Sequence, residues 1–376
     1  MKKDISFIFP CLNEEKTIKG CIIELQEVLD KMNINYEIII SDNGSTDNSV
    51  EIAKELGVKV VHTQVKGYGS ALKNGFANAQ GKYIAFADID GSYPLEYLPE
   101  MYEKAIKEDA DMVIASRTLG TIEKQAMPFL HRYLGTPVLT FLVNFLFRGK
   151  LSDVNSGFRL MKRDSYQKLN VHSNGMEFAS ELLIKSLKQH NKIIEIPAGL
   201  RVDKRDKAPH LNTWRDGMRH LLFIFSEAPK LFEVVGVLVF FLFSAVFVAS
   251  QILGPIKIGH VGILDYHTQL ISIIFATLGM QIWVFSSILY LVKPEDVPSK
   301  ITKYLMNIGE SRLLGIILVI LMLLLYCIIS ILAIWSETGY GQLNLLTYIL
   351  KYIFVISVLG TGVLGLLMTH VIKKSQ

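Results

Sequence analysis

Two aspartates, Asp88 and Asp90, follow a short apolar run in the segment YIAFADIDGSYP, residues 83–94. The run has the composition of a buried strand, and both carboxylates stand at its end. Carboxylate oxygens are hard ligands of the kind that Mg²⁺ and Mn²⁺ prefer. The alternative is that the two side chains only cap the turn that follows. Other polar side chains at the same place in the fold would favour metal binding over capping of a turn.

Polar side chains follow two earlier apolar runs in the same way. Asn13 lies in FPCLNEE after the first run, and Asp42 lies in SDNGSTDNS after the second. Gly44 permits a tight turn, and the residues after it can cap a helix. Alone, this pattern also fits an ordinary turn. Because three such ends occur, we expect them to line one crevice.

Apolar runs alternate with segments of helical spacing through the first third of the chain. The expected strands are ISFIFP, YEIIIS, VKVVH, KYIAFAD and ADMVIAS, and the expected helices cover 14–32, 46–57, 69–81 and 95–109. This alternation predicts an α/β fold with a mostly parallel, doubly wound sheet. Ligands of such sheets bind at the carboxyl ends of the strands, where the polar residues named above fall.

A second group of residues carries charge that could hold an anion. The densest basic cluster, RVDKRDK, contains Arg201, Lys204, Arg205 and Lys207. Its two aspartates leave a solvated loop as the alternative. Arg159, in SDVNSGFRL, is another candidate phosphate or diphosphate ligand. Glu177 and Glu181 are four residues apart and share a helix face, where they could also be plain surface carboxylates.

The 376 residues are divided unevenly between polar and apolar parts. Half are hydrophobic and a fifth are charged, and the net charge of +4 is too small to indicate nucleic-acid binding. Cys11, Cys21 and Cys327 show neither zinc spacing nor an evident disulfide pair, which fits a reducing compartment. The N-terminal apolar run is too short for a signal peptide.

Four apolar stretches are each long enough to cross a hydrocarbon layer of roughly 30 Å. They cover about 231–253, 268–292, 313–335 and 352–371. They contain almost no ionisable residue, which argues against an ion pathway. Lys and Arg concentrate before the first stretch, between the second and third, and after the fourth. The positive-inside rule then places the N-terminal domain in the cytoplasm.

Two further segments are expected at the membrane surface. Residues 124–150 are apolar but are interrupted by Pro128, Gly135 and Pro137, which suits an interfacial helix, with a buried core helix as the alternative. Residues 211–230 place Trp214 beside basic side chains just before the first span. The expected organisation is a globular domain over 1–210, a juxtamembrane amphipathic segment over 211–230 and a transmembrane region over 231–376.

Taken together, the motifs resemble the family 2 glycosyltransferases of the GT-A fold, in the branch that moves a sugar onto a polyprenyl phosphate. The segments that carry the resemblance, in chain order over residues 9–221, are FPCLNEE, SDNGSTD, KGYGSALKNG, ADIDG, SDVNSGFRLMKR, GMEFASELLIKS and HLNTWRDGMRHL. The resemblance implies a GT-A domain that takes a nucleotide-sugar donor and a dolichyl or undecaprenyl phosphate acceptor. The expected nucleotide is UDP, with GDP as the second choice. It implies Mg²⁺ or Mn²⁺ as cofactor and inverting transfer at the cytoplasmic membrane face, giving a lipid-linked sugar for later glycosylation.

The resemblance also implies roles for individual residues. Asp42 would recognise the nucleobase, with Pro10, Asn13 and Glu14 on the same pocket wall. Asp88 would lie near the ribose and diphosphate, and Asp90 would bind the metal with it. Gly69, in KGYGSALKNG, could let the backbone approach the nucleoside. The residues of RVDKRDK would capture the lipid phosphate, and Glu177 and Glu181 would lie on the acceptor side.

Asp153 stands where such enzymes keep a catalytic carboxylate near the acceptor. A phosphate monoester has a second pKa of about 6, so the acceptor oxygen is largely ionised near neutral pH. Such a nucleophile needs positioning more than deprotonation. Asp153 could therefore orient the sugar or a basic residue.

Two other functions remain open at this stage. A processive polysaccharide synthase would carry a Gln-x-x-Arg-Trp motif, which this chain lacks. A non-catalytic nucleotide-sugar-binding subunit of a lipid-sugar flippase would not need Asp42, Asp88, Asp90, Asp153 and Arg159 together. The motifs are compatible with several sugars and with a homo-oligomer.

Overall fold

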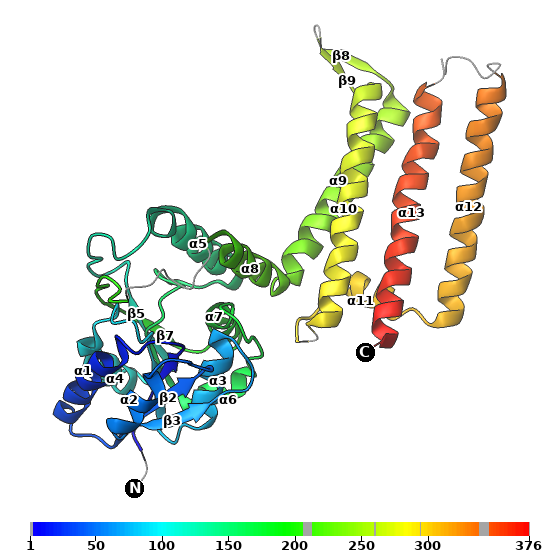
Figure 1. Ribbon diagram of the computed structural model, residues 1–376. Coiled ribbons are helices and arrows are strands. Elements are labelled where there is room, and N and C mark those ends of the chain that lie inside the picture. The colour runs from blue at the N-terminus through cyan, green and yellow to red at the C-terminus, as the bar shows by residue number, and fades with distance from the viewer. Residues whose placement is uncertain (1–2, 206–212, 259–260, 294, 338–345, 376) are drawn as a thin grey trace. The chain divides into compact units, whose positions relative to one another are not determined.

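The computed structural model describes residues 3–205, 213–258, 261–293, 295–337 and 346–375. The chain forms two compact units, Met1–Phe225 and Ser226–Gln376 (Figure 1). A sheet covered by helices makes up the first unit. Long helices make up most of the second.

Seven strands form one sheet in the order β3-β2-β1-β4-β6-β5-β7. Six of them run in the same direction, and β6 is antiparallel to both of its neighbours. The predicted mostly parallel α/β sheet is confirmed. The strands are β1 (Ile5–Cys11), β2 (Tyr36–Asp42), β3 (Lys59–His62), β4 (Tyr83–Phe86), β5 (Met112–Ser116), β6 (Arg159–Lys162) and β7 (Ile193–Pro197).

Helices cover both faces of this sheet, which is why β1, β4 and β5 appear in the sequence as continuous apolar runs. One face carries α1 (Ile18–Lys31), α2 (Ser49–Glu55) and α4 (Leu98–Lys107). The other face carries α3 (Tyr68–Ala77), α6 (Arg163–Leu169) and α7 (Phe178–Lys188).

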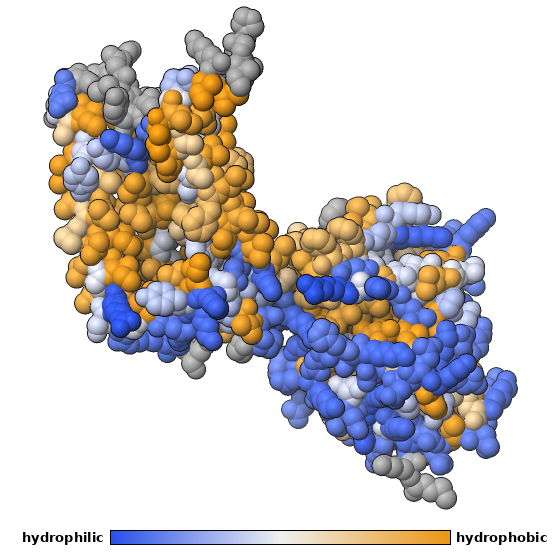
Figure 2. All heavy atoms as spheres, turned by 180° about the vertical axis from the view of Figure 1, so that it is seen from behind, coloured by the Kyte–Doolittle hydropathy of each residue, from blue (hydrophilic) through white to orange (hydrophobic). Residues whose placement is uncertain are grey.

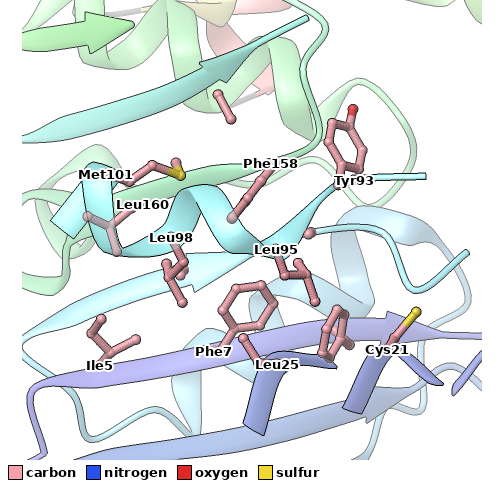
Figure 3. Packing of buried hydrophobic residues seen from close by; sticks show 14 of the residues in the cluster. Ile5, Phe7, Cys21, Leu25, Tyr93, Leu95, Leu98, Met101, Phe158 and Leu160 are labelled. Atoms are coloured by element: carbon pink, nitrogen blue, oxygen red, sulfur yellow. The ribbon is translucent and has the colours of Figure 1, made fainter. Parts of the chain in front are cut away.

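The core on the α1 and α4 side is closed by aromatic and aliphatic side chains from distant segments (Figure 3). The ring centroids of Phe7, on β1, and Phe158, just before β6, are 6.1 Å apart. Leu95, on the short 3-10 helix η1 (Leu95–Tyr97), and Leu98, at the start of α4, pack into the same cluster. These contacts hold β1, the loop before β6 and the start of α4 together, next to the loop that carries Asp88 and Asp90.

The strand β6 is absent from the sequence-based prediction and is the one reversed strand of the sheet. Phe86, the last residue of β4, pairs with Arg159, the first residue of β6. Because β6 runs backwards, the residues that precede it lie at the edge where β4 ends. Residues 153–158 are thereby brought to Asp88 and Asp90.

The segment expected at the membrane surface forms a π-helical turn, η2 (His131–Gly135), and the helix α5 (Thr136–Phe147). Large apolar side chains on this segment remain exposed: Phe129 by 74%, Tyr133 by 60%, Phe141 by 65% and Phe145 by 64%. A buried core helix would not leave these rings in solvent. The helix α8 (Thr213–Ser226) covers most of the expected juxtamembrane segment.

Four helices of the second unit are long and apolar enough to cross a membrane, as predicted. They are α9 (Pro229–Leu253), α10 (Tyr266–Val292), α12 (Glu310–Glu337) and α13 (Leu346–Ser375). Figure 2 shows hydrophobic residues along the sides of this unit. A hairpin of β8 (Ile256–Ile258) and β9 (Val261–Ile263) joins α9 to α10, and the short helix α11 (Lys300–Met306) precedes α12.

Glycines bring α9 and α10 into close contact. A Cβ atom on Gly236 would lie 2.5 Å from the backbone N of Trp283, and one on Gly279 would lie 2.4 Å from that of Phe240. Helices in lipid associate largely through packing, and small residues permit such approach. These two positions therefore hold the first pair of spans together.

Candidate active site

The loops after β1 and β2 are joined at the carboxyl edge of the sheet. Asn13 adopts a left-handed conformation, with φ of 60°, and its Oδ1 accepts a hydrogen bond of 2.7 Å from the backbone N of Thr46. The backbone N of Glu14 donates to Ser49 Oγ at 2.8 Å. Pro10 lies within β1, one residue before the strand ends. The structure thus places Pro10, Asn13 and Glu14 beside the end of β2.

Asp42 closes β2 and is buried. Its carboxylate accepts hydrogen bonds from the backbone N of Gly44 at 3.1 Å and of Ser45 at 3.0 Å, and it contacts His62 Nδ1 at 3.0 Å. Burial alone would raise the pKa of Asp42, but hydrogen bonds from Ser45, His62 and Gly44 hold that pKa below its ordinary value. Asp42 is therefore an anion at the sheet edge.

Asp88 lies two residues beyond β4, between two tyrosines and a glycine. The hydroxyl of Tyr68 hydrogen-bonds its carboxylate, and the hydroxyl of Tyr93 accepts from the backbone N of Gly157 at 2.7 Å. A Cβ atom on Gly157 would lie 2.8 Å from Asp88 Oδ2, so only glycine leaves room for this carboxylate. Burial, and then the charge of Asp90, raise the pKa of Asp88 to about 7.

Asp90 and three other acidic or basic side chains form a charged group that we call the Arg205 clamp. It consists of Glu14, Asp90, Asp203 and Arg205. Arg205 Nη1 lies 3.2 Å from Glu14 Oε1, and Arg205 Nη2 lies 3.2 Å from Asp90 Oδ2. Burial raises the pKa of Glu14, although the charge of Arg205 opposes this. One arginine thus meets three carboxylates, from the end of β1, the end of β4 and the basic segment.

The basic segment lies along the residues that follow β4. The backbone N of Arg201 donates to Ser92 O at 2.8 Å, and that of Lys204 donates to Asp90 O at 3.1 Å. Lys204 is exposed, and its side chain passes over Gly91. Lys207 lies outside the described residues. The segment is therefore attached directly to the Asp88–Asp90 loop.

Arg201 is not part of the Arg205 clamp and forms ion pairs with two other carboxylates. Its Nη1 lies 2.9 Å from Glu24 Oε1 on α1, and its Nη2 lies 2.7 Å from Glu96 Oε2 on η1. Both contacts neutralise its charge. This placement argues against the expected role of Arg201 as a lipid-phosphate ligand. Among the described residues of the basic segment, Arg205 and Lys204 are the cations beside Asp90.

Asp153 is fully buried and forms a two-point ion pair with Arg117, the residue directly after β5. Arg117 Nε lies 2.7 Å from Asp153 Oδ2, and Arg117 Nη2 lies 2.8 Å from Asp153 Oδ1. Burial alone would raise the pKa of Asp153, but Arg117 and two backbone N–H groups outweigh it and lower that pKa. Sequence reasoning missed Arg117, although its position after a strand was a usable signal.

Arg159 does not lie open to a ligand. Its side chain is fully buried, and its Nε, Nη1 and Nη2 donate to the backbone oxygens of Ser156, Ala179 and Val154 at 2.8–2.9 Å. A guanidinium held by three carbonyls supports the loop before β6. This geometry argues against the expected phosphate-binding role.

The remaining predicted positions also have structural partners. A Cβ on Gly69 would lie 2.6 Å from Phe178 Cβ and 2.9 Å from Gly175 O, so the backbone that approaches Gly69 is the protein's own loop. Glu181 is buried and accepts from the backbone N of Ser173 at 2.7 Å and from Lys185 Nζ at 2.8 Å. Glu177 Oε1 accepts from the backbone N of Gly175 at 3.1 Å.

The residues at the end of β4 fit a divalent cation in their chemistry. Asp88 and Asp90 supply carboxylate oxygens, and burial, followed by the charge of Asp90, raises the pKa of Asp88, which a bound cation would oppose. Within the described part of the chain, no cluster of three or more His, Cys, Asp or Glu side chains is arranged as a metal site. A cation held by Asp88 and Asp90 would keep coordination positions for phosphate oxygens and water, as Mg²⁺ commonly does.

The chain is similar in sequence to proteins of known name. One relative, the low-salt glycan biosynthesis hexosyltransferase Agl6 of Haloferax volcanii, is 39% identical over 48% of this chain and 44% of its own length. The dolichol-phosphate mannosyltransferase of Pyrococcus furiosus is 29% identical over 51% of this chain and 54% of its own length. The matches thus span about half the length of these two relatives.

A solved structure supports the fold alone. The glucosyl-3-phosphoglycerate synthase of Mycobacterium tuberculosis, in complex with Mn²⁺, UDP-glucose and phosphoglyceric acid, matches with a TM-score of 0.50 and 22% identity. The match covers 60% of this chain and 80% of that one. Residues 6–169 match the family described as Glycosyl transferase family 2. With the strand-end aspartates and the GT-A sheet, this match shows that residues 6–169 form a glycosyl transferase family 2 domain.

Proposed function

We propose that this protein transfers a sugar, with inversion, from a nucleotide-sugar to a polyprenyl phosphate at the cytoplasmic face of a membrane. UDP is the first choice of nucleotide and GDP the second. The observation that carries the proposal is the contact between Asp90, at the end of β4, and Arg205, on the basic segment. A site that holds carboxylates and a cation side by side suits a metal-bound diphosphate.

The donor half of the site follows from the carboxyl edge of the sheet. Asp42, with Asn13 and Glu14 nearby, would bind the nucleoside. Asp88 and Asp90 would hold Mg²⁺ or Mn²⁺. When bound, such a metal supplies Lewis-acid stabilisation of the leaving diphosphate. Arg205 would exchange its contacts with Glu14 and Asp203 for diphosphate oxygens, since a guanidinium binds phosphate in the same forked geometry as carboxylate.

The acceptor half follows from the pair of Asp153 and Arg117. Asp153 stays ionised and accepts both hydrogen bonds from the guanidinium. We therefore assign it to orient Arg117 rather than to remove a proton. Arg117 would attract the acceptor phosphate, whose oxygen is already largely ionised at neutral pH.

Two features support a lipid acceptor. The second unit has four helices that could span a membrane, and η2 and α5 expose aromatic side chains on an otherwise polar unit. The two relatives described above include one named for dolichol phosphate. Basic residues in the loop between α10 and α12 and at the end of α13 favour a cytoplasmic catalytic unit.

The test is a transfer assay with the full chain in membranes. Radiolabelled UDP- and GDP-sugars would be supplied with Mn²⁺ and a polyprenyl phosphate, and Asp90→Asn would be the inactive control. We expect label in a lipid that releases its sugar in mild acid. Label in a polymer would instead identify a polysaccharide synthase, and thermal stabilisation by a donor without any transfer would identify a binding subunit.

A further inference from the structure

A half-open cavity of about 160 Å³ lies between α10, α11 and α13 of the second unit. Two helical stripes form its main walls: Met280, Trp283, Val284 and Ser287 on α10, and Gly362, Gly365, Leu366 and Thr369 on α13. Leu305 and Met306 of α11 complete it. Both stripes have the i, i+3, i+4, i+7 spacing of one helix face. The lining is therefore mostly apolar and comes from two facing helices.

The cavity arises because two glycines on α13 act differently. A Cβ on Gly365 would lie 2.3 Å from Val284 Cγ2, so this glycine lets the two helices touch. A Cβ on Gly362 would meet only the end of Met280, at 3.9 Å. The missing side chain at Gly362 is thus not replaced by a neighbour. The helices α10 and α13 are therefore in contact at Gly365, and a space remains between them one turn away, at Gly362.

A buried polar network holds the α11 wall in place. Trp283 Nε1 donates to Thr302 Oγ1 at 2.8 Å, and Thr302 Oγ1 in turn hydrogen-bonds Glu233 of α9. Glu233 also accepts from the backbone N of Ser299 and from Tyr290 Oη, the latter at 2.7 Å. Glu233 is 4% exposed. Because these partners fix α11 against α9 and α10, the cavity is formed in advance of any ligand.

Positive charge stands at one end of the cavity. Lys373 Nζ donates to the backbone oxygen of Met306, a lining residue, at 3.3 Å, and to Asn307 Oδ1 at 2.6 Å. Lys303 lies one helical turn before Met306 on α11. An apolar cavity with Lys373 at one end is complementary to an amphiphile with an apolar chain and an anionic head.

We propose that this cavity binds a methyl-branched segment of the isoprenoid chain of a polyprenyl phosphate in a holding position, with the phosphate at Lys373, before that phosphate is used as the acceptor at Arg117. The proposal rests on the proposed function for the choice of lipid. An apolar cavity of about 150 Å³ can hold a ligand of benzene size, so this one holds about one isoprene unit rather than a whole chain. A short widening between two helices suits a branched chain better than a straight one.

Cavity-filling variants provide the test, with full-length protein in detergent. Gly362→Leu fills the space from α13, and Ser287→Leu fills it from α10. Gly360→Leu is the matched control, since a Cβ at Gly360 meets nothing within 4 Å. The probes are a polyprenyl phosphate, the corresponding polyprenol and a linear alcohol of equal carbon number. The readout is the shift in unfolding temperature.

We expect both polyprenyl probes, and not the linear alcohol, to stabilise the wild type and Gly360→Leu. In Gly362→Leu and Ser287→Leu the shift falls to less than about half. Lys373→Ala weakens the effect of the phosphate but not that of the polyprenol. Equal shifts in folded Gly362→Leu and Ser287→Leu, or an equal shift with the linear alcohol, overturn the proposal. The polyprenol arm needs no sugar transfer, so it is informative even if the proposed function fails.

Discussion

Arg117 Nε and Nη2 meet the two carboxylate oxygens of Asp153 at 2.7 and 2.8 Å, at the edge of the sheet where β5 ends. The pair joins the loop after β5 to the loop before β6. Oδ2 also accepts from the backbone N of Arg117, and Oδ1 from the backbone N of Asn155, so all four lone-pair sites of the carboxylate are used. A base would need at least one of them for the group that it deprotonates.

This geometry predicts that Asp153→Asn lowers activity because Arg117 is no longer held in position. Removing one partner of a buried ion pair costs about 3–5 kcal/mol, so we expect a lower unfolding temperature together with reduced transfer. The shape of the pH–rate profile should not change, because Asp153 is already ionised. Rate measurements across neutral pH check this. If the variant kept full stability and lost only the alkaline or acidic limb of the profile, Asp153 would be a base after all.

The two arginines of the basic segment should behave differently. Arg205→Ala removes the cation beside Asp90 and Glu14, and we expect kcat/KM for the donor to fall by about tenfold or more. Arg201→Ala breaks two partly exposed ion pairs, each worth about 0–1 kcal/mol, and should leave transfer nearly unchanged. Steady-state kinetics with varied donor distinguish them. Similar losses in both variants would contradict the assignment of Arg205.

Gly157 is predicted to be required for the Asp88 carboxylate rather than for the fold. In Gly157→Ala the new methyl group would lie 2.8 Å from Asp88 Oδ2 and must displace it. We expect loss of stabilisation by Mn²⁺ with donor, measured by thermal unfolding. Gly20→Ala on α1, where a Cβ meets nothing, is the control and should bind as the wild type does. Unchanged donor binding in Gly157→Ala would show that Asp88 does not need its present position.

Glu181 should make the first unit sensitive to acid. Burial would raise its pKa, but Lys185, Ser173 and His172 outweigh this and lower it from 4.5 to about 2. At a pH between these two pKa values, Glu181 is mostly protonated in the unfolded chain and ionised in the folded chain. Its contribution, about 3 kcal/mol, is therefore present above pH 4.5 and is lost as the pH falls toward 2.

The comparison of wild type with Glu181→Gln measures this contribution. The difference in unfolding temperature should be large near neutral pH and should shrink as the pH falls below about 4.5. Glu177→Gln, one turn earlier in the chain, serves as the control because Glu177 accepts only a local hydrogen bond from Gly175. A difference that stayed constant with pH would indicate a packing effect rather than a charge effect.

The aspartates of the site could be placed from the sequence because strand ends are local features. An apolar run followed by Asp88 and Asp90 already assigns them to the carboxyl edge. The partners of these groups could not be placed, because they come from far along the chain. Asp90 and Arg205 are 115 residues apart, and their contact depends on how the basic segment lies along residues 90–92.

The strand β6 escaped prediction for a different reason. It has four residues, Arg159–Lys162, and begins and ends with a charged side chain. Such a segment is normally expected in solvent. Arg159 is buried because the backbone oxygens of Val154, Ser156 and Ala179 satisfy its guanidinium, and this arrangement exists only once the loop before β6 is folded.

The reversed strand also sets the order in which the protein can assemble. Strands β1 to β4 are complete once Phe86 has been synthesised, and they can pair among themselves. Phe86 cannot gain its partner Arg159 until a further 73 residues have followed. Contacts of such sequence separation form late because a long loop must close first. The strand ends that carry Asp42, Asp88 and Asp90 can therefore take shape on a growing chain. Gly157, Arg205 and the acceptor side join them only later.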